Sequence, residues 1–200
     1  MSVDHPCLSL VPSDEERELR STVRAIAAKY GHQYWVSDSA SGGNPTELWR
    51  DLGQAGLLGV AVPEEHGGGG GTFTDLVTVT EELAAGGLPL PLLVISPSVC
   101  ATVLAGSGTP EQKAAWLPGL ASGEKVMCFA ITEPDAGLNT HALRTRGVRR
   151  EGGWRIDGEK YYVPRGQLRR DPGQRPGPAS ATPAAAARCR CSSSTSTPPG

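Results

Sequence analysis

The hydrophobic pattern of this 200-residue chain changes its period once, near residue 126, and that change limits the folds open to it. Before residue 126 the apolar residues recur every three or four positions, which is typical of amphipathic helices. From Val126 onward apolar and polar residues alternate in short runs, which is typical of strands. The sequence therefore predicts an α+β protein: an N-terminal α-helical bundle over 1–125, an incomplete antiparallel β domain over 126–164, and a disordered tail over 165–200.

Start and stop signals divide the first part of the chain into predicted helices. Ser13, with Glu16 three residues later, forms a capping box for the first helix, and Thr72 or Thr74 can cap the third. The stretches 31–43 and 117–125 lack such signals and are predicted to be loops. The predicted helices cover 13–30, 44–55 with Asn44 as its cap, 72–85, 91–105 with a bend near Pro97, and 109–116 with Thr109 as its cap.

Two features of the helical part could be mistaken for functional sites. The run Gly67–Gly71 could form a phosphate cradle, but no strand precedes it and no helix with a Lys-Ser/Thr pair follows it. We therefore predict a flexible connector there. Glu81 and Glu82 are neighbours on a helix, where successive side chains point about 100° apart, so they do not share one site. We expect them to be mostly solvated, and a subunit or domain contact is the alternative for one of them.

The composition argues against several classes of function. The formal net charge is −2 and charged residues make up 20% of the chain, which does not favour binding of nucleic acid or an acidic membrane. The four His are scattered without the spacing of metal ligands. The stretch Leu88–Ala105 is interrupted by prolines and is too short to span a bilayer, and Asp4 argues against a signal peptide. We expect a cytoplasmic protein in which Cys7, Cys100 and Cys128 are reduced thiols.

The segment 129–139, FAITEPDAGLN, is where a strand-like run ends in a turn rich in side-chain oxygens. Pro134 lacks an N–H group and favours extended geometry at Glu133, and Gly137 allows a close approach of the backbone. Freed N–H groups and the Thr132 hydroxyl at such a strand end can bind a flat polar heterocycle and, further along, a phosphate. The alternative interpretation is a strand that ends in an ordinary loop.

Downstream of this segment, short strands give way to a different composition. The predicted strands cover 126–131, 143–150, 154–156 and 159–163, with turns at 151–153 and 157–158. Residues 165–200 contain almost no large apolar side chains and cannot bury a core, which predicts disorder. A second hypothesis is a reading-frame shift, because residues 191–200 can be written in codons, GC-ending where allowed, that read two nucleotides out of frame as Phe-Leu-Val-Asp-Val-Asp-Thr-Pro. The nucleotide sequence of the gene tests it.

Five motifs that stand in register resemble those of the acyl-CoA dehydrogenase family. The segment 129–139 is similar to the family's flavin-contacting signature, aromatic-x-x-Thr-Glu-Pro-x-Ala-Gly-Ser-Asp. The other four agree in order and spacing, so the resemblance covers about Ser13 to Pro164. These four are VPEEHGG at 62–68, EEL at 81–83, LPGLASGE at 117–124 and IDGEKYYV at 156–163.

The resemblance implies an FAD-dependent enzyme that introduces a double bond between the α and β carbons of an acyl-CoA thioester. It also implies an acyl-CoA substrate, an electron-transfer flavoprotein as partner, and a homo-oligomer. Thr132 would bind the polar edge of the flavin ring, and Tyr162 would form an aromatic wall beside it. The implied FAD-binding residues are Phe129, Ala130, Ile131, Thr132, Gly137, Leu138, Tyr162 and Val163.

The chain departs from the family pattern at several positions. Leu138 and Asn139 stand where the family usually has Ser-Asp, which removes a hydroxyl near the pyrophosphate and the substrate. Pro164 stands in place of a Thr and lacks its hydroxyl and N–H. The family's general base is a Glu of a C-terminal helical domain without a counterpart here, so we assign no catalytic residue, and Glu133 belongs to the signature instead.

We therefore expect a truncated and inactive fragment that binds FAD poorly. One alternative is a non-catalytic partner subunit of a complete dehydrogenase. Another is a fragment of a related acyl-CoA oxidase or flavin monooxygenase, which shares the fold.

Overall fold

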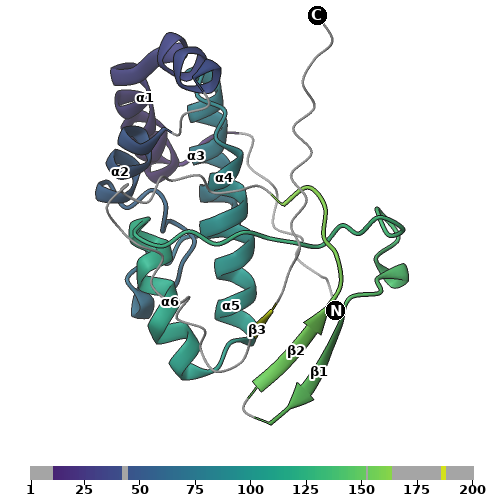
Figure 1. The fold of residues 1–200 in the computed structure, drawn as a ribbon. Helices are drawn as coiled ribbons and strands as arrows, with labels where there is room; N and C mark the ends of the chain where they lie inside the picture. Colours follow the sequence, from purple (N-terminus) through teal and green to yellow (C-terminus); the bar gives the residue numbers. More distant parts are fainter. Residues whose placement is uncertain (1–10, 42–44, 152, 164–185, 188–200) are drawn as a thin grey trace, which may run out of the picture. The chain divides into compact units, whose positions relative to one another are not determined.

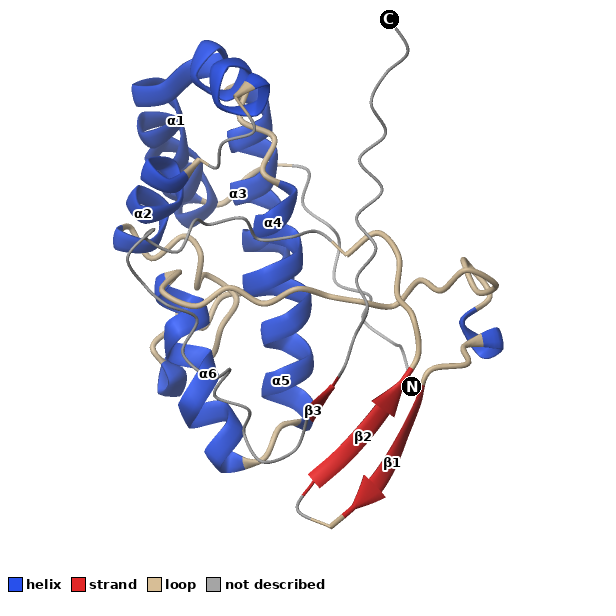
Figure 2. Cartoon of the chain, in the orientation of Figure 1, coloured by secondary structure: helices blue, strands red, loops and turns tan. Residues whose placement is uncertain are grey.

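The computed structural model describes residues 11–41, 45–151, 153–163 and 186–187. The chain divides into two compact units, Met1–Met127 and Cys128–Gly200. The first unit is helical and the second contains a small sheet (Figure 1, Figure 2). The predicted α+β class is thereby confirmed, whereas the predicted tail lies outside the described residues except at 186–187. Among the helices that the structure describes, none is long and apolar enough to cross a membrane.

The helical unit is built around a leucine-rich core. Leu48, Leu52, Leu83 and Leu117 are completely buried, and burial of each such side chain contributes about 2 kcal/mol. The elements of this unit are α1 (Asp14–Ala40), α2 (Thr46–Gln54), the 3-10 turn η1 (Glu64–His66), α3 (Phe73–Ala85), α4 (Pro91–Leu93), the π-helical turn η2 (Val94–Cys100), α5 (Ala101–Ser107) and α6 (Pro110–Ser122).

Capping side chains set where the longer helices begin. The Ser13 hydroxyl accepts a hydrogen bond from the backbone N–H of Glu16 at 3.1 Å, and Thr72 and Thr109 each lie in a complete capping box. The predicted starts at these three residues are confirmed, because a cap depends only on residues close in sequence. The capping box at Ser13 is only half formed, since the Glu16 carboxylate accepts hydrogen bonds from Arg20 and not from the backbone N–H of Ser13.

Helix α1 is longer than predicted. Gly31 has φ 70° and ψ 174°, so it interrupts the helical geometry, but the helix resumes and continues to Ala40. Tyr30 and Tyr34 pack across the interruption with ring centroids 4.8 Å apart. The predicted loop is therefore wrong over residues 31–40, because Gly31 kinks the helix without ending it. The predicted cap of the second helix, Asn44, lies outside the described residues.

Two prolines lie inside helical segments. Pro97 was expected to bend a helix, and it lies in η2, the π-helical turn between α4 and α5. Pro118 lies inside α6, which continues to residue 122, so the predicted loop is wrong over residues 117–122. An interior proline costs about 3 kcal/mol, and the complete burial of Leu117 and Leu120 offsets that cost at about 2 kcal/mol each.

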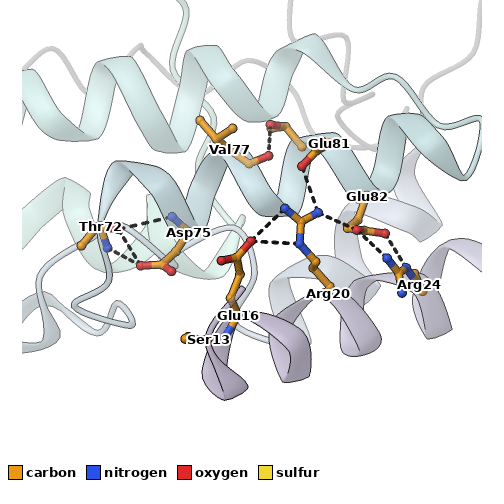
Figure 3. A network of polar contacts seen from close by, with 10 residues as sticks. Ser13, Glu16, Arg20, Arg24, Thr72, Asp75, Val77, Glu81 and Glu82 are labelled. Carbon is orange, nitrogen blue, oxygen red and sulfur yellow. Dashed lines mark hydrogen bonds and ion pairs between the residues drawn. The ribbon is translucent and has the colours of Figure 1, made fainter. Parts of the chain in front are cut away.

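Glu82 lies buried between α1 and α3, where two arginines of α1 bind it (Figure 3). Arg24 Nε donates to its Oε2 at 2.6 Å, and Arg20 Nη1 donates to its Oε1 at 2.6 Å. Arg20 also pairs with Glu16 and with the exposed Glu81. The prediction that Glu82 is mostly solvated is wrong, because its side chain is 7% exposed and its partners belong to the same unit. The prediction that Glu81 and Glu82 do not share one site is also wrong, because Arg20 Nη1 binds both carboxylates. Hydrogen bonds from Arg24 and then Arg20 lower the pKa of Glu82.

We expect Glu82→Gln to lower the free energy of unfolding of the helical unit by about 2 kcal/mol, because both arginines lose their buried anion. The matched control is Glu81→Gln, which removes an exposed pair and should change the value by less than about 0.5 kcal/mol. Urea unfolding followed by circular dichroism measures both variants.

The pH dependence of this effect has a definite sign. Because the folded-state pKa of Glu82 is lowered, its stabilisation is present above the unfolded-state pKa and is lost as the pH falls through the folded-state pKa. The difference between wild type and Glu82→Gln should therefore shrink in acid. Equal losses of unfolding free energy in the Glu82 and Glu81 variants at neutral pH would contradict the stabilising role of the buried Glu82 carboxylate.

The glycine run Gly67–Gly71 forms a hydrogen-bonded loop beside η1. All five of its N–H groups donate to backbone carbonyls of residues 59–64; for example, Gly71 N lies 2.8 Å from Val60 O. A Cβ atom at Gly68 would lie 2.1 Å from the carbonyl oxygen of Val62. The prediction of a flexible connector is wrong, because close backbone packing requires glycine here. Since these N–H groups are already used, the loop is also no phosphate cradle.

We expect Gly68→Ala to lower the free energy of unfolding by about 2 kcal/mol, because the new methyl group overlaps the Val62 carbonyl. The control is Gly106→Ala in α5, where no atom lies within 4 Å of the added Cβ. Its higher helix propensity should raise the stability by about 0.5–1 kcal/mol. Thermal unfolding of the two variants measures the difference. Stabilisation by both would show that the loop is not closely packed.

The second unit contains a β-hairpin and short turns. Its elements are the 3-10 turn η3 (Thr140–Ala142), β1 (Arg146–Arg150), β2 (Gly153–Asp157) and β3 (Ala186–Ala187). β1 pairs antiparallel with β2, with Arg150 opposite Gly153, and β3 pairs parallel with β2 in the order β1-β2-β3. The predicted strands at 143–150 and 154–156 are confirmed in part, as the antiparallel pair β1 and β2. The predicted hairpin turn at 157–158 is wrong, because Asp157 ends β2 and no strand follows it over 158–163. The predicted strands at 126–131 and 159–163 are wrong, since neither stretch forms a strand in the described part of the chain.

Candidate functional site

The segment 129–139 folds into a tight turn. Glu133 and Ala136 exchange two backbone hydrogen bonds of 3.1 Å, which close the turn around Pro134. Proline at this position restrains φ and lacks an N–H group, so it suits the second position of a turn. Ala136 is buried, whereas Leu138, two residues later, is fully exposed. The segment thus forms a tight turn whose two ends, Glu133 and Ala136, are buried, and the chain is exposed again at Leu138.

The carboxylate of Glu133 is buried and surrounded by donors. Its Oε2 accepts from the backbone N–H of Arg144 at 2.6 Å, and its Oε1 accepts from the backbone N–H of Thr145 at 3.0 Å and from Lys160 Nζ at 2.8 Å. The Arg144 amide, followed by Lys160 and Thr145, lowers the pKa of Glu133 to about 2. A carboxylate with so low a pKa is a poor general base at neutral pH.

Two stretches that contain predicted flavin-binding residues lie side by side in this unit. Tyr161 donates its backbone N–H to the carbonyl of Thr132 at 2.9 Å. Lys160 Nζ donates to the carbonyl of Ile131 at 2.9 Å, across 29 residues of sequence. We call these two stretches together, residues 129–132 and 160–163, the paired edge.

Several side chains of the paired edge are exposed. Phe129 is 41%, Ile131 37% and Tyr162 85% exposed, so an aromatic and aliphatic surface faces solvent within this unit. The half-buried Thr132 places a hydroxyl within the same edge. The remaining predicted cofactor residues are Ala130 and Val163, which lie on the edge, and Gly137 and Leu138, which lie outside it.

The backbone of Tyr162 has an unusual conformation. Its φ is 53°, in the left-handed region, and it is the one non-glycine residue in the described part of the chain with a positive φ. A bulky residue there carries strain of about 1–3 kcal/mol. Its ring lies at an angle of 71° to that of Tyr161, with centroids 6.4 Å apart. Such strain is often found where a side chain must be presented for binding.

We expect Tyr162→Asn to leave the stability of the second unit unchanged or to raise it by up to about 1 kcal/mol, because asparagine tolerates a positive φ better than tyrosine. The control is Tyr161→Asn, which removes a half-buried ring and should lower the stability. Hydrogen exchange of the β1 and β2 amides measures the free energy of local opening. An equal loss from both variants would contradict strain at Tyr162.

Sequence reasoning missed the residues that support the edge. It placed Glu133 in the turn but gave no role to Lys160 or to the amides of Arg144 and Thr145. One signal was available: Glu133 comes shortly after the apolar run 129–131 and Lys160 directly precedes the run 161–163, and a charge buried there needs a partner. In the described part of the chain, no group of three or more His, Cys, Asp and Glu side chains could hold a metal ion.

Comparison with known proteins connects both units to one family. The family model "Acyl-CoA dehydrogenase, N-terminal domain" matches residues 13–124. The chain is similar to acyl-CoA dehydrogenase FadE12 of Mycobacterium tuberculosis (strain H37Rv), with 44% identity over 155 residues, covering 78% of this chain and 40% of that protein. It is also similar to (2S)-methylsuccinyl-CoA dehydrogenase of Cereibacter sphaeroides, with 36% identity, covering 75% of this chain and 28% of that protein.

Solved structures show the same similarity. A glutaryl-CoA dehydrogenase in complex with glutaryl-CoA has a TM-score of 0.71 at 28% identity, covering 78% of this chain and 40% of that chain. A glutaryl-CoA dehydrogenase of Mycobacterium smegmatis in complex with FADH2 has a TM-score of 0.67 at 30% identity, covering 74% and 38%. A structure of the electron transferring flavoprotein of Acidaminococcus fermentans has a TM-score of 0.73 at 26% identity, covering 80% and 43%. The chain spans less than half the length of these proteins.

Proposed function

Because the chain belongs to the acyl-CoA dehydrogenase family, we propose that it carries part of an FAD site for the α,β-dehydrogenation of an acyl-CoA thioester. The observation that supports this proposal is the paired edge. It joins Phe129–Thr132 to Lys160–Val163 by hydrogen bonds and leaves apolar side chains exposed. We keep the division of the chain at 1–125, 126–164 and 165–200 as part of the proposal.

The residues of the paired edge fit a flavin. A planar tricyclic ring needs apolar contact on its face and polar partners on its rim. Phe129, Ile131 and Tyr162 supply exposed apolar surface, and Thr132 supplies a hydroxyl. When bound, FAD would accept the hydride from the substrate's β carbon. The chain's own residues would bind and orient the ring and exclude water from one side of it.

Glu133 is a structural residue in this proposal. Its carboxylate already accepts three hydrogen bonds, and its pKa of about 2 makes proton abstraction from an α carbon unfavourable. We therefore propose that the general base is not among these 200 residues. The 200-residue chain assayed alone should then not turn over an acyl-CoA. Measurable turnover would place the base within these 200 residues.

The proposal extends to partners and location. We infer that the complete site binds an acyl-CoA and passes electrons to an electron-transfer flavoprotein, and that the protein works as a homo-oligomer in the cytoplasm.

Leu138 is fully exposed, where the family signature usually has a serine. Leu138→Ser restores a hydroxyl acceptor and donor at the proposed pyrophosphate side.

We expect the purified 200-residue chain to bind FAD weakly but saturably, as measured by quenching of flavin fluorescence. Tyr162→Ala should raise the dissociation constant about three- to tenfold, because the ring loses an aromatic contact. Val148→Ala is the matched control, since Val148 is also exposed but lies on β1 outside the paired edge. Quenching that never saturates, or an equal effect of the two variants, would overturn the proposed site.

A further inference from the structure

We propose that Glu133 and Lys160 act as positioning residues: their buried ion pair clamps the two halves of the paired edge together and so shapes the surface offered to the flavin. This inference rests on the proposed function, because it deepens the account of the same site. Neither residue would contact the cofactor's reacting atoms. Their role would be to hold the backbone from which the contacting side chains project.

The clamp is a closed set of hydrogen bonds. Lys160 Nζ lies 2.8 Å from Glu133 Oε1 and 2.9 Å from the carbonyl oxygen of Ile131. The next residue, Tyr161, donates its N–H to Thr132 O at 2.9 Å. Lys160 therefore binds both the side chain of Glu133 and the backbone of Ile131. Tyr161 adds one backbone hydrogen bond to Thr132.

The ion pair is shielded from water. The side chain of Glu133 is 5% exposed and that of Lys160 is 13% exposed. In such surroundings an ion pair is much stronger than at a surface, and removing one partner leaves the other charge buried without its counterion. The amides of Arg144 and Thr145 fix the carboxylate from the side of β1. The carboxylate therefore has a defined position from which to hold Lys160.

The contacts between the two stretches include the polar bonds of Lys160 and Tyr161. Phe129, Ile131 and Tyr162 each leave more than a third of their surface exposed within their unit. In addition, the strained φ of Tyr162 must be maintained by what surrounds it. The bonds of Lys160 and Tyr161 lie directly before this residue in sequence. Loss of the clamp should therefore release the Tyr162 ring from its orientation.

The experiment uses the full 200-residue chain with two measurements on each variant. Hydrogen exchange of the Tyr161 amide reports on the clamp in the absence of flavin, and FAD titration reports on the surface. We expect Lys160→Met and Glu133→Gln each to reduce protection of the Tyr161 amide about tenfold and to raise the dissociation constant for FAD about tenfold. Lys160→Arg, which keeps a cation and donors, should recover part of both effects and the visible spectrum of the bound flavin.

Two controls separate the clamp from general damage. Glu159→Gln removes an exposed charge next to Lys160 and should change neither measurement. The double variant Glu133→Gln/Lys160→Met should lose less than the sum of the single losses, because the two residues act as one unit. Circular dichroism checks the helical unit of each variant, and exchange protection of the β1 and β2 amides checks the second unit, so a variant that fails to fold is recognised.

Each outcome decides a different point. Full protection of the Tyr161 amide in Lys160→Met would overturn the clamp. Lost protection with unchanged FAD affinity would overturn the positioning role. Absence of FAD binding by the wild type would overturn the proposed function and its flavin-positioning role together, and lost amide protection would then mark a purely structural ion pair.

Discussion

A carboxylate can lie inside a small protein only where donors replace the water that it has lost, and Glu133 shows how this requirement organises the second unit. Its donors come from the entry to β1 and from Lys160. Two stretches, at 144–145 and at Lys160, must therefore converge on the turn that carries Glu133. The turn around Pro134, the start of the hairpin at Arg144 and the paired edge all depend on that convergence.

The helical unit also surrounds a buried carboxylate with donors, but there the ion pairs have a different effect on the structure. Glu82 is also buried, but its donors are the long side chains of Arg20 and Arg24, and Arg24 remains largely exposed. A large leucine core already holds α1 and α3 in the same unit, so the network mainly fixes their relative position. In the second unit Phe129, Ile131 and Tyr162 of the paired edge are exposed, and hydrogen bonds from Lys160 and Tyr161 join its two stretches.

The sequence predicted features that depend on neighbouring residues and missed those that depend on distant ones. The caps at Ser13, Thr72 and Thr109 need only a few residues, and they were found. The kink at Gly31 and the helical position of Pro118 were missed, because core packing overrides local stop signals. Within the site, the motif located the turn and the residues of the edge, but not the Glu133–Lys160 pair, since hydrophobic periodicity says nothing about which charges meet.

The conformation of Tyr162 connects the structure to its proposed use. A chain optimised only for stability would have glycine or asparagine at a φ of 53° and would cover Phe129 and Ile131. Instead, a strained aromatic residue stands exposed beside an exposed apolar stretch, directly after a buried ion pair that can hold it there. Strain of this kind persists only where surrounding contacts enforce it. The rigidity of the clamp and the exposure of the edge thus depend on each other. The buried bonds of Glu133 and Lys160 fix the backbone, so the apolar side chains of the paired edge can stay exposed for binding.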